Sequence, residues 1–151
     1  MNIADAITLL LEQHEEIRSL AKEAMSVLER TKENASTEDY ELLLEKLITL
    51  KARLVEHGRK EEELIVPILQ DMYHPQAEMA RYVEDEHTHM EEELKEIKKH
   101  LREHILNKSE RLEEVIYSKA KTFLTQTITH LFEEESGLFP MLKGFLSQVK
   151  K

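Results

Sequence analysis

The strongest constraint on the fold is the spacing of apolar residues, which recur at intervals of three and then four along four long segments. This spacing puts the apolar side chains on one stripe of each helix, as in helices that pack into a bundle. The breaks between the segments are short and rich in turn-forming residues. With only three Gly and three Pro in 151 residues, a turn-rich β architecture is excluded. The sequence therefore predicts an all-α chain.

Short connections make consecutive helices antiparallel, which predicts an up-down-up-down four-helix bundle. Pro67 and Pro140 lack a backbone N–H, so each is expected to kink or end its helix. The chain is expected to form one domain, 1–151, whose helices span about 3–33, 37–73, 76–106 and 109–135, with a short helix at 138–149.

Charge and composition limit the kinds of partner and the compartment that this chain can have. The net charge is −10 and no stripe of Lys or Arg stands out, which argues against nucleic acid. The absence of Cys excludes disulfides, iron–sulfur clusters and thiolate zinc sites. The first residues lack the features of a signal peptide, and no apolar run approaches the roughly 20 residues of a membrane span. A cytoplasmic protein without a membrane partner is expected, and its oligomeric state is left open.

Two segments 73 residues apart carry the same polar pattern. Aligning His57 with His130 also aligns Glu61 with Glu134 and Pro67 with Pro140. The same offset relates two further histidines, His14 and His87. This echo of one helix hairpin by the next predicts a bundle with internal two-fold pseudo-symmetry.

The four histidines occupy positions in the apolar stripes, one in each helix. Glu61 and Glu134 follow their histidines by four residues and so share the inward face. A single core histidine is more often simply hydrogen-bonded. Two core carboxylates, however, cost several kcal/mol each unless they are compensated. Since no Lys or Arg of the stripes is placed to pair with them, two divalent metal ions are the predicted compensation.

Carboxylate and imidazole ligands without thiolate suit iron, manganese or zinc. Helical bundles build dinuclear sites from Glu and His side chains on facing helices. Here the two glutamates would bridge two ions, and two histidines would bind each ion as further ligands. Positions left open would accept water, hydroxide or a diatomic ligand.

The segments HGRKEEELIVP (57–67) and HLFEEESGLFP (130–140) resemble the two signatures of hemerythrin-like (HHE cation-binding) domains. LLEQHEEI and EDEHTHM resemble the first and third helices of that family, so that the similarity covers essentially the whole chain. The resemblance implies a non-haem di-iron centre with an oxo, hydroxo or water bridge. Its terminal ligands would be the four histidines and its bridging ligands Glu61 and Glu134. Members of the family bind or sense oxygen, sense iron, handle nitric oxide or repair iron centres.

Two departures bear on function. Oxygen-carrying members have a histidine where this chain has Glu91, which is either a further ligand or a solvated charge. They also have His-x-x-x-x-Asp in the fourth helix, where this chain has Glu134 at plus four. The pattern is closer to the four-histidine, two-glutamate sites of iron-centre repair proteins, which carry a cysteine-containing domain that this sequence lacks.

Three functions therefore remain: a di-iron protein that binds or senses oxygen, nitric oxide or iron, a di-iron enzyme acting on nitric oxide, peroxide or ferrous iron, and a metal-free structural bundle. Whether the chain is an enzyme is left open, with a binding role preferred.

Neighbouring residues are assigned lesser roles. His89, two residues from His87, is expected on the surface, and Glu62 and Glu135 are expected behind the ligands or on the surface. His100 and His104 are expected on a solvated face, with a surface zinc site as the alternative. The walls of the ligand pocket are expected to be formed by residues one or two turns before the ligands, namely Leu50, Leu54, Phe123 and Thr127.

Overall fold

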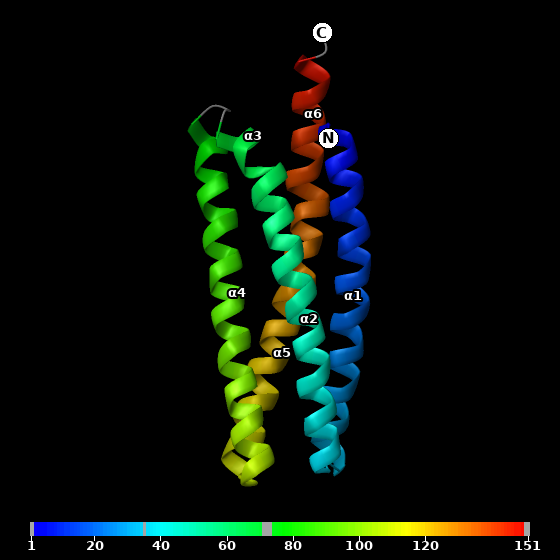
Figure 1. Cartoon of the computed structure of the whole chain (residues 1–151), viewed down its shortest axis with the longest axis vertical. Helices are drawn as coiled ribbons and strands as arrows, with labels where there is room; N and C mark the ends of the chain where they lie inside the picture. The colour runs from blue at the N-terminus through cyan, green and yellow to red at the C-terminus, as the bar shows by residue number, and fades with distance from the viewer. Residues whose placement is uncertain (1, 35, 71–73, 150–151) are drawn as a thin grey trace.

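The structure is a computed structural model that describes residues 2–34, 36–70 and 74–149. Every element in these ranges is helical, which confirms the all-α prediction. Four long helices lie side by side, consistent with a four-helix bundle (Figure 1). The elements are α1 (Ile3–Asn34), α2 (Thr37–Leu64), α3 (Val66–Gln70), α4 (His74–Leu106), α5 (Glu110–Glu133), the π-helix η1 (Glu134–Leu138) and α6 (Phe139–Val149).

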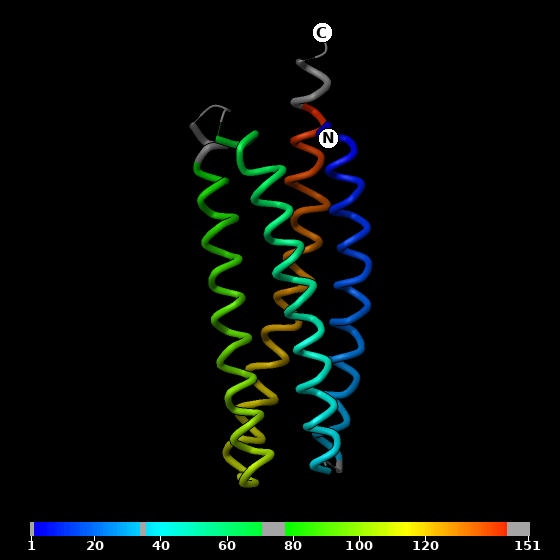
Figure 2. Tube along the Cα trace, viewed as in Figure 1, coloured from blue at the N-terminus to red at the C-terminus, as the bar shows by residue number. Residues whose placement is uncertain are grey.

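The four long helices form a square in which each has two neighbours. α1 packs against α2 and α5, and α4 packs against the same two helices. The trace in Figure 2 passes down α1, back along α2, down α4 and back along α5. Inward-facing residues from all four helices at one height can therefore meet.

The buried core consists of two apolar clusters. One contains Ile17, Leu47, Leu94 and Phe123, with other apolar residues of α1, α2, α4 and α5. The other contains Ile7, Leu10 and Phe139. His14 lies between Leu10 and Ile17 on the same face of α1, so a layer of polar residues separates the two clusters. Polar groups in this layer are shielded from water on both sides.

Side-chain caps fix two helix starts. Ser36 accepts a hydrogen bond from the Asp39 N–H, and the Asp39 carboxylate accepts one from the Ser36 N–H, so the pair forms a capping box. Ser109 accepts a hydrogen bond from the Leu112 N–H at the start of α5. These caps satisfy backbone donors that have no partner within the helix.

His104 corrects a prediction. It is 2% exposed rather than solvated, its Nδ1 accepts a hydrogen bond from the Ser109 N–H, and its ring packs edge-on against Tyr40. The sequence does not reveal this because the connection into α5 folds back over the end of α4. His104 therefore anchors that connection.

The two prolines interrupt their helices differently. α2 ends at Leu64, and Pro67 is the second residue of the short α3, so the expected helix 37–73 is divided at Ile65; residues 71–73 lie outside the described ranges. Before Pro140 the helix instead widens into η1, where the Phe139 N–H donates to the Glu134 carbonyl five residues back. Pro140 has no N–H for the Ser136 carbonyl, and a wider turn accommodates this loss. The helix that was expected to end near residue 135 therefore continues from α5 through η1 into α6.

Candidate metal centre

The six predicted ligands lie together in the polar layer. They come from all four sides of the bundle: His14 from α1, His57 and Glu61 from α2, His87 from α4, His130 from α5 and Glu134 from the first position of η1. Five are almost fully buried, and the His87 side chain is 12% exposed. Their ligand atoms form two groups, each within 4.8 Å.

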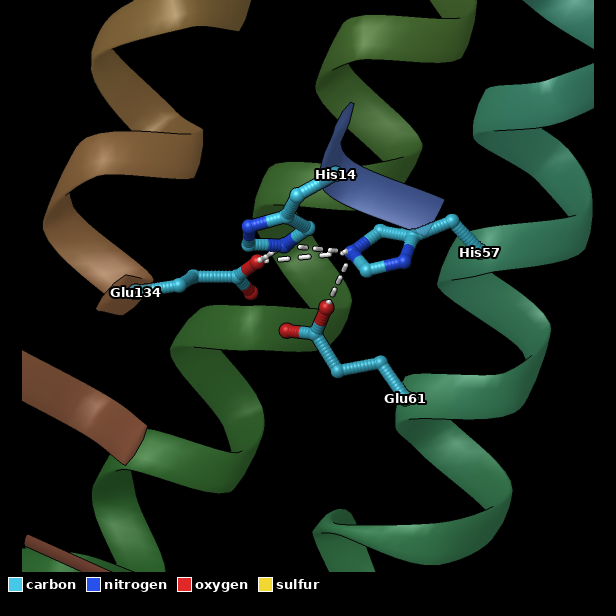
Figure 3. A group of neighbouring side chains, drawn as sticks. All are labelled: His14, His57, Glu61 and Glu134. Atoms are coloured by element: carbon cyan, nitrogen blue, oxygen red, sulfur yellow. Dashed lines mark hydrogen bonds and ion pairs between the residues drawn. The ribbon is translucent and has the colours of Figure 1, made fainter. Parts of the chain in front are cut away.

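The first group joins His14 and His57 to the two glutamates (Figure 3). The Nε2 atoms of His14 and His57 lie 3.1 Å apart. Glu134 Oε1 lies 2.8 Å from His14 Nε2 and 3.4 Å from His57 Nε2, and Glu61 Oε2 lies 2.9 Å from His57 Nε2. Two imidazole nitrogens and two carboxylates thus surround one point.

The second group joins His87 and His130 to the same glutamates. Glu61 Oε1 lies 3.8 Å from His87 Nε2, and Glu134 Oε2 lies 3.4 Å from His130 Nε2. Each glutamate therefore turns one oxygen toward the first histidine pair and its other oxygen toward the second. This is the arrangement required of a carboxylate that bridges two ions.

Several of these atoms are buried without an aligned hydrogen bond: both oxygens of Glu61, Oε2 of Glu134 and Nε2 of His87 and of His130. Buried polar atoms without partners are uncommon in folded proteins, and each is an available ligand for a cation. The donor set contains carboxylate oxygens and imidazole nitrogens only. The residues therefore fit the pair of hard or intermediate metal ions that the sequence predicts.

Burial and the short distances between charged groups shift the pKa values of the residues in the cluster. Burial, together with the charge of Glu134, raises the pKa of Glu61 to about 8. Burial lowers the pKa of His57 and His130, but the carboxylates around them outweigh it and raise these pKa values to about 9 and about 11. Burial also opposes ionisation of Glu134, yet contacts with Glu61 and three histidines lower its pKa well below the usual range. Without metal, protons thus partly balance the carboxylates.

Each histidine has a second partner on its Nδ1 atom. The four Nδ1 atoms face oxygens of Glu135 (3.1 Å from His14), Gln13 (2.9 Å from His57), Glu62 (3.1 Å from His87) and Glu86 (2.7 Å from His130). At His14, His57 and His87 the Nδ1–H donates, since an amide oxygen and a carboxylate accept, whereas Glu86 is an ion-pair partner of His130 without an aligned hydrogen bond. The Nε2 atoms therefore face the cluster, where each can give its lone pair to a metal ion once it carries no proton. Metal-binding histidines are commonly oriented in this way.

Glu62 and Glu135 were expected behind the ligands or on the surface; they contact His87 and His14 and are partly exposed. Gln13 and Glu86 were not expected. Each directly precedes a histidine in the sequence, and the two are themselves 73 residues apart. The repeat, extended by one position, is the signal that could have found them.

Gly58 makes room for His87. A Cβ at this position would lie 3.3 Å from His87 Nδ1, closer than ordinary van der Waals contact. Glycine in a helix interior costs about 1 kcal/mol relative to alanine, so its presence in α2 is explained by the close approach of α4.

A cavity of about 20 Å³ adjoins the centre between α2 and α4. Leu54 lines it as expected, together with His57, His87, Met90 and His130. Leu50, Phe123 and Thr127, expected in the same wall, are fully buried but are not among the lining residues. The volume suffices for one water-sized molecule.

Glu91 lies at the edge of the same cavity, where its side chain is exposed. Among the described residues, it belongs to neither group of clustered ligand atoms. His89 is 65% exposed, as expected, and pairs with Glu93.

The helices and the buried His/Glu cluster define a helical-bundle protein with a candidate metal-binding centre. The hemerythrin HHE cation binding domain matches residues 5–142, so the chain belongs to this family of metal-binding domains. No curated protein sequence and no solved structure matches the chain. None of the described helices has the length and apolar character needed to cross a bilayer.

Proposed function

We propose that this chain is a non-haem di-iron protein that binds or senses a small ligand, with oxygen or nitric oxide as the ligand class. The observation that carries the proposal is that two histidine pairs share the same two glutamates. His14 and His57 would hold one ion, His87 and His130 the other, and Glu61 and Glu134 would bridge them. Zinc or manganese would fit the same donors.

The 73-residue repeat extends to the contacts of the site. Glu135 faces His14 as Glu62 faces His87, and Gln13 faces His57 as Glu86 faces His130. We propose on this basis that the up-down-up-down bundle has a pseudo-two-fold axis through the centre.

The iron pair would supply open coordination positions and a change of redox state. The chain itself keeps the Nε2 atoms turned inward, holds the carboxylates away from water and leaves a small, largely apolar cavity beside three of the histidines. A cavity of about 20 Å³ favours a diatomic ligand over a larger substrate. Localisation in the cytoplasm is part of the proposal.

The test is metal analysis and an optical spectrum after aerobic loading of the purified chain with ferrous iron. Two irons per chain and a ligand-to-metal charge-transfer band are expected, and oxygen or nitric oxide should change the band reversibly. His57→Ala should lower the stoichiometry, whereas His89→Ala is the matched control because its side chain is exposed. One ion or fewer per chain in the wild type and His57→Ala alike would refute the proposal. Repeated turnover instead of reversible binding would indicate an enzyme.

A further inference from the structure

The two positions of the centre have matching inner ligands but different surroundings. Each consists of two histidines and the shared glutamates. The residues that contact the histidines from behind are related by the 73-residue repeat, yet they differ in charge at one of the two places.

Behind His14 and His57 an arginine offsets negative charge: Arg18 pairs with Glu135 and also with the exposed Glu15. The partner of His57 is the neutral amide of Gln13. The partner of His14 is Glu135, whose two oxygens accept hydrogen bonds from Arg18 Nη2 at 2.6 and 2.9 Å. A guanidinium bound in this way withdraws negative charge from the carboxylate, so Glu135 does little to strengthen His14 as a ligand.

Behind His87 and His130 the charge is negative. Both partners are carboxylates, Glu62 and Glu86, and neither has a Lys or Arg within ion-pair distance among the described residues. Glu62 is 42% exposed, so solvent screens part of its effect. Glu86 is the stronger contributor because it is 21% exposed and lies 2.7 Å from His130 Nδ1. Where Arg18 stands in one half, the repeat places Glu91 in the other.

The surface outside His130 is also negatively charged. A cleft of about 420 Å³ between α4 and α5 reaches His130 and is lined by Asp85, Glu86 and Glu133. None of the described residues that line it is a Lys or Arg. A cleft lined by one sign of charge concentrates ions of the opposite sign. Cations are therefore attracted to the same half of the centre.

We infer that the two positions are unequal, and that the position formed by His87 and His130 binds a divalent ion first and more tightly. The inference rests on the proposed dinuclear site and assigns a role to four residues outside the ligand set: Gln13, Arg18, Glu62 and Glu86. A carboxylate behind a ligating histidine typically changes metal affinity by about 10- to 100-fold. Residues 13 and 86 occupy equivalent places, so exchanging their side chains tests the assignment directly.

The experiment is a calorimetric titration of the metal-free chain with zinc, using the wild type, Glu86→Gln, Gln13→Glu and the double variant. The wild type should bind two ions in steps that differ by about tenfold or more. Glu86→Gln should weaken the tighter step by about tenfold, and Gln13→Glu should tighten the weaker step to a similar extent. Arg18→Gln should also tighten the weaker step, while Arg53→Gln, an exposed arginine paired with Glu16, is its control.

The outcomes separate this inference from the function on which it rests. Fewer than two ions per wild-type chain would overturn the dinuclear site itself. Two ions of equal affinity, or a Glu86→Gln variant with both steps unchanged, would leave the dinuclear site standing and overturn the inequality. Melting of each variant in chelator shows that it is folded, and the Arg18 variant tests the same charge difference without altering a residue that contacts a histidine.

Discussion

Replacing Glu61 with Gln should stabilise the metal-free protein and destabilise the metal-loaded one. Glu61 is fully buried and its two oxygens have no aligned hydrogen bond. Burial and the charge of Glu134 raise its pKa to about 8, above the ordinary 4.5. The folded chain therefore holds a proton that the unfolded chain releases between these pH values, and Glu61 makes the fold less stable as pH rises through this window.

The size of the stabilisation by Glu61→Gln follows from the distance between pH 7 and the ordinary pKa of 4.5. Each pH unit corresponds to about 1.4 kcal/mol, so at pH 7 the buried carboxyl costs up to roughly 3 kcal/mol relative to a side chain that cannot ionise. Gln keeps the shape and removes this cost. For a chain of this size the upper limit is a rise in Tm of roughly 6–12 °C in chelator.

With metal the order should reverse. Wild-type protein at a free metal concentration 1,000 times Kd gains about 4.1 kcal/mol per ion, more than the roughly 3 kcal/mol that the buried carboxyl costs, whereas Glu61→Gln loses a ligand shared by both positions and most of this gain. Thermal melts at pH 7, in chelator and with zinc, measure both effects. Glu63→Gln on the same helix is the control, because Glu63 is 61% exposed and its one ion pair among the described residues is with Lys60 at 3.9 Å. The reasoning fails if Glu61→Gln is the less stable protein in chelator, or if it binds two ions as tightly as the wild type.

Three further predictions concern the surroundings of the centre. Gly58→Ala should weaken metal binding because its added Cβ would lie 3.3 Å from His87 Nδ1, whereas the Cβ of Gly144→Ala meets no described atom within 4 Å and should leave binding unchanged in the same zinc titration. The Tm of the metal-free chain should fall from pH 6.5 toward pH 9, because the folded chain keeps protons on His57 and His130, with pKa values raised to about 9 and about 11, that the unfolded chain releases above the ordinary 6.5. The metal-loaded chain should show a smaller fall, and equal slopes would contradict this. Lys98→Met should raise the free energy of unfolding at pH 7 by about 1 kcal/mol, since burial and nearby Lys51 lower the pKa of Lys98 to about 8. The gain should shrink above pH 8, where wild-type Lys98 is neutral. Denaturant melts measure both effects, and Lys99→Met, at an exposed position, should show neither.

The all-helical architecture and the place of the centre could be predicted because both depend on local spacing. A residue four positions after His57 or His130 lies on the same face of the helix, so Glu61 and Glu134 had to face inward with their histidines. The 73-residue repeat related the two halves without any knowledge of packing. The structure brings all six residues into one buried layer, while their role as metal ligands stays a prediction.

Other features depend on how the helices are rotated and set against one another, which no local spacing specifies. The contacts of Gln13 with His57 and of Glu86 with His130 cross between helices. The burial of His104 depends on the connection that folds over the end of α4.

The sequence by itself determined the helices and the polar residues that they turn inward, because periodicity and the cost of burying charge act within each segment. Only the tertiary structure decided that Glu61 and Glu134 each face both histidine pairs, and that Arg18 pairs with Glu135 whereas Glu86 has no Lys or Arg within ion-pair distance among the described residues. The physical reason is that a charge is strengthened or cancelled by groups a few ångströms away in space, and those groups come from other helices.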